Sequence, residues 1–127
     1  MTTIYGRRAN LALDRAFRGM RIAATALDAE RARIDVITKN IANARTTRVP
    51  GSDEPYRREE VACAPILERA ANGRSEVMGV RIDGVLQDDA PFEEVFDPNH
   101  PDANDRGVVL YPNVNTMKEM ADLVTAT

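Results

Sequence analysis

The chain has 127 residues, 43% of them hydrophobic and 29% charged, a composition typical of a folded domain rather than a disordered segment. Its formal net charge is -3, only 5% of its residues are aromatic, and it contains no tryptophan. The low aromatic content favours helices completed by assembly over an independent compact core, and no run of residues reaches the ~18–20 apolar positions of a membrane span.

The charge is unevenly divided along the chain. Residues 1–58 carry 12 Lys or Arg and 6 Asp or Glu, whereas residues 59–127 carry 5 and 14. Such polarity is typical of one end of a subunit that attracts the other end of its neighbour, and equally of solvated surface charge. Nucleic acid is not expected as a partner, because the basic residues are interspersed with acidic ones and lack aromatic neighbours.

A long amphipathic helix is predicted from about Asp14, a candidate N-cap, to Ala44, although the apolar residues before Asp14 would allow an earlier start. Residues 1–13 precede it as an arm that is mobile or partly helical. Its apolar residues recur at alternating steps of four and three, the 3.5-residue period of a helix that packs against other helices. Arg31 and Thr38 fill the two polar slots of the row, where a charge fixes register or partner choice. The apolar row contains Met20, Ala24, Leu27, Ile34 and Ile41, with Ile37 beside it.

A β-rich insert is predicted over residues 49–112, after the turn-rich linker VPGSDEP. An extended segment over residues 56–67 and an alternating apolar segment over residues 78–86 flank the turn dipeptide Asn72-Gly73, so we expect a β-hairpin. Cys63 lies in the first segment. As the single cysteine it supports no internal disulfide, and we expect it to be a small buried filler.

An acidic loop is predicted to follow the hairpin. Residues 87–107 contain seven acidic residues and four Pro or Gly, so we expect no regular element there. Val108–Tyr111 is expected to form a short strand that Pro112 closes.

A second helix is predicted from Asn115, a good N-cap, with Glu119 in the first turn, where a carboxylate is favoured. Its apolar row contains Met117, Met120 and Leu123. The predicted fold class is therefore α+β: a long N-terminal helix and a C-terminal helix form a coiled-coil-like pair, with a small hairpin-rich insert between them. The corresponding parts are an arm and assembly helix (1–48), the β-rich insert (49–112) and the start of a C-terminal assembly helix (113–127).

No catalytic, cofactor or metal site is predicted. His100 is the only histidine and has no neighbouring cysteine, so we expect it to stabilise a turn or lie on the surface. An EF-hand-like spacing starts at Asp102, but Arg106 stands at a ligand position and Asn113 replaces the bidentate Glu, so calcium is not expected. There is no Gly-rich phosphate loop and no nucleophile with a histidine partner, so an enzyme with a small-molecule substrate is not expected either.

Two long motifs resemble a known family. The run DVITKNIANARTT at Asp35–Thr47 resembles the N-terminal signature of the bacterial flagellar rod, hook and hook-associated proteins. The run FDPNHPDANDRGVVLYPNVNTMKEM at Phe96–Met120 is similar to the C-terminal signature of the proximal rod subunits of the flagellar basal body, and the segments PYRR at 55–58 and GVLQDD at 84–89 resemble them as well. The residues that carry the motifs are Asn40, Ala42, Asn43, Asp97, Pro98, His100, Pro101, Pro112, Asn113, Glu119 and Met120.

This resemblance implies a structural subunit of the proximal rod, the hollow drive shaft that transmits torque and lines the export channel. It implies paired terminal helices inside the assembly and the insert outside. It also implies a C-terminal helix that continues beyond Thr127, so that this chain is expected to be truncated or to be the covered part of a longer product. The implied partners are other rod subunits, further copies of the chain, and basal-body ring and rod-adaptor proteins. The implied location is the periplasm-spanning rod, reached through the flagellum's own export channel without a cleaved signal peptide.

Two alternatives to this interpretation stay open. One is another subunit of the same rod family. The other is a small soluble protein-binding domain that uses the hairpin as its recognition surface.

Overall fold

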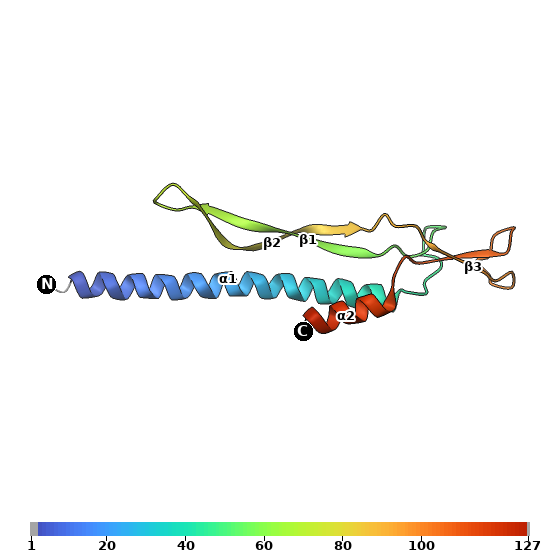
Figure 1. Ribbon diagram of the computed structural model, residues 1–127, viewed down its shortest axis with the longest axis horizontal. Helices are drawn as coiled ribbons and strands as arrows, with labels where there is room; N and C mark the ends of the chain where they lie inside the picture. Colours follow the sequence, from blue (N-terminus) through green and yellow to red (C-terminus); the bar gives the residue numbers. More distant parts are fainter. Residues whose placement is uncertain (1–2, 127) are drawn as a thin grey trace. The chain divides into compact units, whose positions relative to one another are not determined.

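The computed structural model describes residues 3–126, so Met1, Thr2 and Thr127, which belong to the predicted arm and C-terminal helix, lie outside the described residues. Within them a long helix, four strands and a short helix follow one another, as Figure 1 shows from blue to red. The predicted α+β class is confirmed. The chain divides into two compact units: unit 1 contains residues 1–31 and 63–83, and unit 2 contains residues 32–62 and 84–127.

Helix α1 is a single uninterrupted element, Thr3–Ala42 (Figure 1). Of the two starts that the sequence left open, the one at Asp14 is wrong, because Asp14 lies inside the helix, and the earlier one is found. The preceding residues RRANLAL contain no proline or glycine and are mostly good helix formers, so the helix has no physical reason to begin later. At its other end the Asn43 side chain donates a hydrogen bond to the Lys39 carbonyl at 2.9 Å and satisfies a terminal carbonyl of the helix.

Strands β1 (Glu59–Arg69) and β2 (Ser75–Gln87) pair in one two-stranded sheet. The predicted hairpin is confirmed, and so is its turn: the Ala70 amide donates to the Arg74 carbonyl at 2.8 Å, and Gly73 has a φ of 82°. A side chain at that φ is disfavoured, so glycine suits the turn. The prediction that Cys63 is buried is wrong, because burial alternates along β1 and Cys63 lies on the exposed face.

In unit 1, α1 meets β2 at a glycine. Thr25 Oγ1 donates to the Ile22 carbonyl at 2.8 Å and accepts the Val80 amide at 3.1 Å. A Cβ atom added to Gly79, whose φ is 152°, would lie 2.6 Å from Thr25 Oγ1. The helix and the strand therefore approach this closely only because residue 79 has no side chain.

In unit 2, β3 (Glu93–Phe96) and β4 (Val108–Tyr111) pair antiparallel, with Val95 opposite Val109. Strand β4 was predicted and is confirmed. The expectation of no regular element over residues 87–107 is wrong, because β3 lies within them. Four residues are too few to show a clear alternation and two of them are Glu, so β3 depends on pairing with a strand distant in sequence.

Helix α2 (Thr116–Ala126) begins as predicted, because Asn115 Oδ1 accepts the Lys118 amide at 3.3 Å. It lies beside the last turns of α1 (Figure 1). Its apolar face, formed by Met117, Met120 and Val124, is exposed, whereas Glu119 on another face is fully buried. The predicted coiled-coil-like pairing of the two helices stays a prediction.

Candidate functional site

A buried Arg–Glu pair lies in unit 2. Arg58 directly precedes β1, and its Nε donates to Oε1 of Glu119 in the first turn of α2. The Arg58 side chain is 11% exposed and that of Glu119 is 0% exposed. Glu119 is also favoured by the positive end of its own helix. Each charge relies on the other, because a buried charge left without its partner costs roughly 3–5 kcal/mol.

Asn40, fully buried in the last turn of α1, joins this pair. Its Nδ2 donates to the Glu59 carbonyl at 2.9 Å and lies 3.4 Å from Glu119 Oε2. Its Oδ1 accepts the Glu59 amide at 3.0 Å and the Tyr56 hydroxyl at 2.7 Å. The side chain thus pairs with both backbone groups of Glu59, as a neighbouring strand would, and this requires a group that is donor and acceptor at once. Asn40 therefore ties the end of α1 to the start of β1.

Asn113 binds the backbone of Arg58 and joins the same hydrogen-bond network. Its Oδ1 accepts the Arg58 amide at 2.7 Å, and its Nδ2 donates to the Asp88 and Ala90 carbonyls, both at 3.0 Å. Arg58 Nη1 also pairs with Glu60 and lies 3.4 Å from Asp88 Oδ2. We call Asn40, Tyr56, Arg58, Asn113 and Glu119 the polar junction. Among the described residues no buried side-chain nitrogen or oxygen lacks a partner, and a network so satisfied fixes one backbone arrangement.

Burial shifts the pKa values of two groups in the junction. It raises the pKa of Tyr56 to about 12, with help from the charges of Glu59 and Glu119 and against that of Arg58. Burial by itself lowers the pKa of Arg58, but the hydrogen bonds and charges of Glu60 and Glu119 outweigh it and hold the pKa above its ordinary value. Around neutral pH, Tyr56 therefore keeps the proton that it donates to Asn40, and Arg58 keeps its charge.

The predicted apolar row of α1 divides between two environments. Ile37 is buried, Ile34 and Ile41 are half-buried, and Ala24 is exposed. On α2, Leu123 is half-buried. The larger predicted row residues that lie in solvent, with exposures between 50% and 77%, are Met20, Leu27, Met117 and Met120. Within a single copy, the residues of the predicted apolar row therefore do not all pack on one buried face.

The motif residues also divide. Asn40, Asn113 and Glu119 meet at the polar junction, and Pro112 is fully buried. Asp97, Pro98, His100 and Pro101 lie in a separate turn, where the His100 amide donates to the Asp97 carbonyl at 3.1 Å and His100 Nδ1 accepts the Asp102 amide at 3.0 Å. The lone histidine thus stabilises a turn, one of the two roles predicted for it. Ala42 and Met120 are exposed.

Sequence reasoning missed Tyr56 and Arg58 as members of the site. Both lie in the segment PYRR, which was recognised only as a resemblance. A usable signal was available in α2, where Glu119 precedes Leu123 by four residues and so shares its side of the helix rather than the side of Met117 and Val124. A carboxylate on a half-buried helix face calls for a cation, but the sequence does not say which arginine supplies it.

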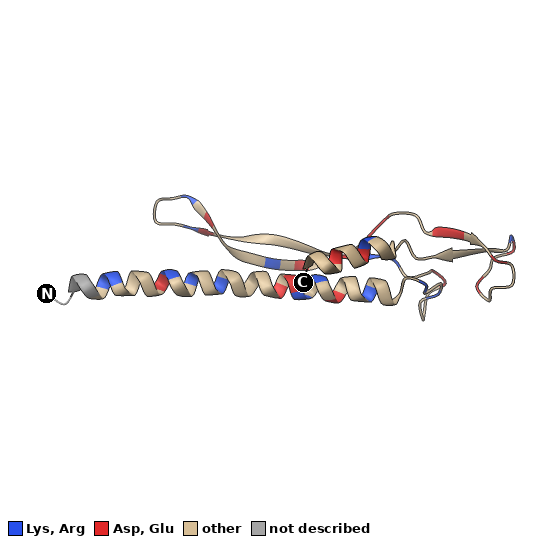
Figure 2. Cartoon of the chain, turned by 60° about the horizontal axis from the view of Figure 1, so that its bottom comes forward, with Lys and Arg blue, Asp and Glu red and all other residues tan. Residues whose placement is uncertain are grey.

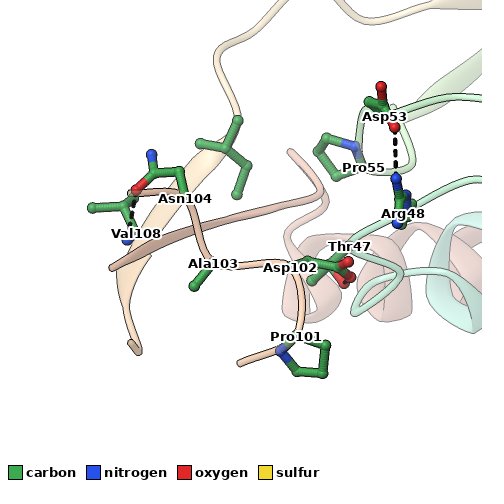
Figure 3. Close-up of a pocket in the computed structure, with 10 residues that line it drawn as sticks. Thr47, Arg48, Asp53, Pro55, Pro101, Asp102, Ala103, Asn104 and Val108 are labelled. Carbon is green, nitrogen blue, oxygen red and sulfur yellow. Dashed lines mark hydrogen bonds and ion pairs between the residues drawn. The ribbon is translucent and has the colours of Figure 1, made fainter. Parts of the chain in front are cut away.

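A polar pocket of about 440 Å³ lies elsewhere in unit 2 (Figure 3). Thr47 Oγ1 donates to Asp102 Oδ2 at 2.6 Å, and Arg48 pairs with Asp53 at 2.7 Å. These contacts give Arg48, Asp53 and Asp102 partners within the lining of the pocket. The lining residues are Thr47, Arg48, Asp53, Pro55, Pro101, Asp102, Ala103, Asn104, Val108 and Leu110.

The residues with EF-hand-like spacing bind different internal donors. Asp102 accepts the Thr47 hydroxyl, Asn104 Oδ1 accepts the Arg106 and Val108 amides at 2.9 and 3.0 Å, and Asn113 accepts the Arg58 amide. Within the described residues no three His, Cys, Asp or Glu side chains gather as a metal site. No described helix is long and apolar enough to cross a membrane.

These features define an α+β protein in which a buried polar junction joins both helices to the strand β1 while the apolar faces of the helices stay exposed. Residues 20–48 match the family described as Flagella basal body rod protein. The chain is 41% identical to the flagellar basal-body rod protein FlgC of Bacillus subtilis (strain 168), over 88% of this chain and 82% of that protein.

Other FlgC proteins give similar matches. That of Borreliella burgdorferi is 37% identical over 87% of this chain and 81% of its own length, and that of Yersinia enterocolitica is 36% identical over 84% and 75%. Relatives this similar over this much of both chains show the family: the chain belongs to the flagellar basal-body rod proteins. The family predicted from the two motifs is thereby confirmed.

Proposed function

We propose that the chain is a structural subunit of the bacterial flagellar basal-body rod and acts through assembly, without a reaction, a cofactor or a small-molecule substrate. The observation that carries the proposal is the 41% identity to a rod protein FlgC over 88% of the chain. The geometry of the helices supports it independently.

Helix α2 gives the first structural support. Glu119 is fully buried, whereas Met117 and Val124 are 77% and 76% exposed. Each exposed large apolar side chain forgoes roughly 1.5–3 kcal/mol relative to burial. A helix that buries its carboxylate and presents its methionines is arranged for neighbours that cover the apolar face.

Helix α1 gives the second support. Leu13, Phe17, Met20 and Leu27 are all at least 55% exposed. On a helix of 3.6 residues per turn they fall within an arc of about 80°, so they form one apolar face. We infer that this face and that of α2 enter coiled-coil-like contacts with neighbouring subunits, which include other copies of this chain.

The polar junction supplies what a drive shaft requires. It holds the last turns of α1, the start of β1 and the first turn of α2 in one arrangement by hydrogen bonds and a buried ion pair. Such directional contacts resist sliding better than apolar contacts alone. We infer that the junction keeps the assembly helices in register with the insert while torque passes through the subunit.

The finer parts of the proposal come from the resemblance of the two sequence motifs to the proximal rod subunits. They are a place in the proximal, periplasm-spanning rod and export without a cleaved signal peptide. The proposed neighbours are other rod subunits and basal-body ring and adaptor proteins. The division into residues 1–48, 49–112 and 113–127 belongs to the same proposal, with the first and last parts as assembly segments.

A complementation experiment tests the proposal. The gene for the host's own subunit is deleted, the chain is supplied on a plasmid, and swimming in soft agar is measured. We expect swimming to return. If the chain is produced and folded but cells stay non-motile, the rod proposal is contradicted, and a monomer that binds an unrelated protein through its hairpin would support the binding-domain alternative.

A further inference from the structure

The two units carry net charges of opposite sign. Unit 1 holds nine Lys or Arg and six Asp or Glu, whereas unit 2 holds eight and 14. Figure 2 shows that blue bands predominate along the N-terminal part of α1, whereas red and blue bands both occur further along α1 and among the strands and loops. Each excess is concentrated in one segment: residues 6–22 hold five Arg and one Asp, and residues 88–105 hold seven Asp or Glu and no Lys or Arg.

Four of the five arginines of residues 6–22 lie on one side of α1. Arg7, Arg8, Arg15 and Arg18 fall within an arc of about 100° on a 3.6-residue helix. All are exposed. Arg18 pairs with Glu76 at 3.5 Å, where both side chains are about half exposed, whereas within the described residues no ion pair engages Arg7, Arg8, Arg15 or Arg21.

The acidic segment is equally open. Asp89, Glu93, Glu94 and Asp105 are exposed, and within the described part of the chain no ion pair engages them. Glu93 and Glu94 are adjacent in β3, so their side chains point to opposite faces of the β3–β4 pair. Negative charge is therefore presented on both sides of this element.

We propose that the arginine side of α1 in one copy receives residues 88–105 of a second copy in a head-to-tail contact. Complementary charge supplies the recognition: a run with five Arg and a single Asp meets a run with seven carboxylates and no Lys or Arg. A contact of this kind uses two different surfaces, so it closes into a ring or propagates along an axis.

A second copy fits this surface better than an anionic membrane. The arginine arc lies opposite the apolar arc of Leu13, Phe17 and Met20. A membrane that took up the apolar arc would leave the arginines turned away from its headgroups. Two protein neighbours can instead cover both arcs. The inference deepens the proposed function and takes its setting in the rod from it, but the contact itself is measurable in solution.

The test is sedimentation equilibrium of the purified full chain. We expect self-association whose dissociation constant rises about tenfold or more as NaCl is raised from 50 to 500 mM, because exposed charges are screened. Arg8→Glu with Arg15→Glu should weaken it by about tenfold or more, and so should Asp89→Lys with Glu94→Lys. When the two variants are mixed, the reversed charges match again and association should return.

A matched control makes the same change of charge elsewhere. Arg69→Glu with Arg74→Glu alters exposed arginines of the hairpin and should leave association within about twofold of the wild type. Circular dichroism must show equal helix content in all variants.

Several results would overturn the inference: a wild-type chain that stays monomeric, a control as damaging as the α1 variant, no recovery on mixing, or arginine-dependent binding to vesicles of anionic lipid without self-association. Swimming restored by the wild-type chain alongside any of these would leave the proposed function standing and remove only this contact.

Discussion

Arg58 contacts two glutamates of different burial, and this difference yields the first prediction. Glu119 is fully buried, whereas the Glu60 side chain is 56% exposed. Glu119→Gln should lower the free energy of unfolding by up to roughly 3–5 kcal/mol, because it removes the fully buried carboxylate that Arg58 Nε contacts and leaves Arg58 only the more exposed Glu60 and Asp88 as acidic partners. Glu60→Gln also removes a carboxylate that pairs with Arg58, but this carboxylate is largely exposed to solvent. The substitution should therefore lower the free energy of unfolding by less than about 1 kcal/mol. Urea denaturation compares them, and equal losses would show that burial does not set the strength of the pair.

Tyr56 yields a prediction at alkaline pH. Its folded-state pKa of about 12 lies above the ordinary value of 10.0, so folding favours the protonated phenol. The corresponding stability is fully present below pH 10 and is lost as the pH rises through 12, and two pKa units correspond to about 2–3 kcal/mol. The difference in unfolding free energy between the wild type and Tyr56→Phe should therefore shrink over this range. A difference that stays constant would contradict the burial of this hydroxyl.

At the scale of elements, Gly79 and Gly84 form a matched pair in β2. Their φ values are 152° and 151°, but a Cβ on Gly79 would meet Thr25 Oγ1 at 2.6 Å, whereas a Cβ on Gly84 would meet nothing within 4 Å. Gly79→Ala should cost roughly 1–3 kcal/mol more than Gly84→Ala, because only the former forces helix and strand apart. Hydrogen exchange at the Val80 amide should accelerate in Gly79→Ala alone. Similar losses in both variants would contradict the close approach of α1 and β2.

The elements differ in how far the sequence predicted them. The hairpin was predictable because Asn72-Gly73 and the alternation beside it are local signals. The N-cap of α2 was predictable for the same reason. The sequence did not fix the start of α1, because Asp14 is a good N-cap residue but nothing before it ends a helix. Strand β3 was missed because its extended form depends on pairing with β4. The polar junction was predicted only as motif residues, since its contacts join positions 40, 58, 113 and 119, whose proximity is a product of the fold.

At the scale of the whole molecule, the exposed helix faces should matter for assembly and not for folding. Leu27→Asp with Met117→Asp changes two side chains that are 60% and 77% exposed in the single chain. The melting temperature of the purified variant should stay within about 3 °C of the wild type, because surface substitutions change stability by about 0.5 kcal/mol or less. A variant that unfolds at 25 °C would show that these residues are already packed within one copy.

The amount of the chain in purified basal bodies tests the central claim most directly. Cells that lack their own subunit would express the wild type, Leu27→Asp with Met117→Asp, or the control Leu86→Asp, whose residue is 61% exposed on β2. Quantitative mass spectrometry of the rods should find the wild type and the control at similar levels and the double variant reduced at least about tenfold, since apolar burial drives association. A double variant that enters the rod as well as the wild type would contradict assembly through these helix faces.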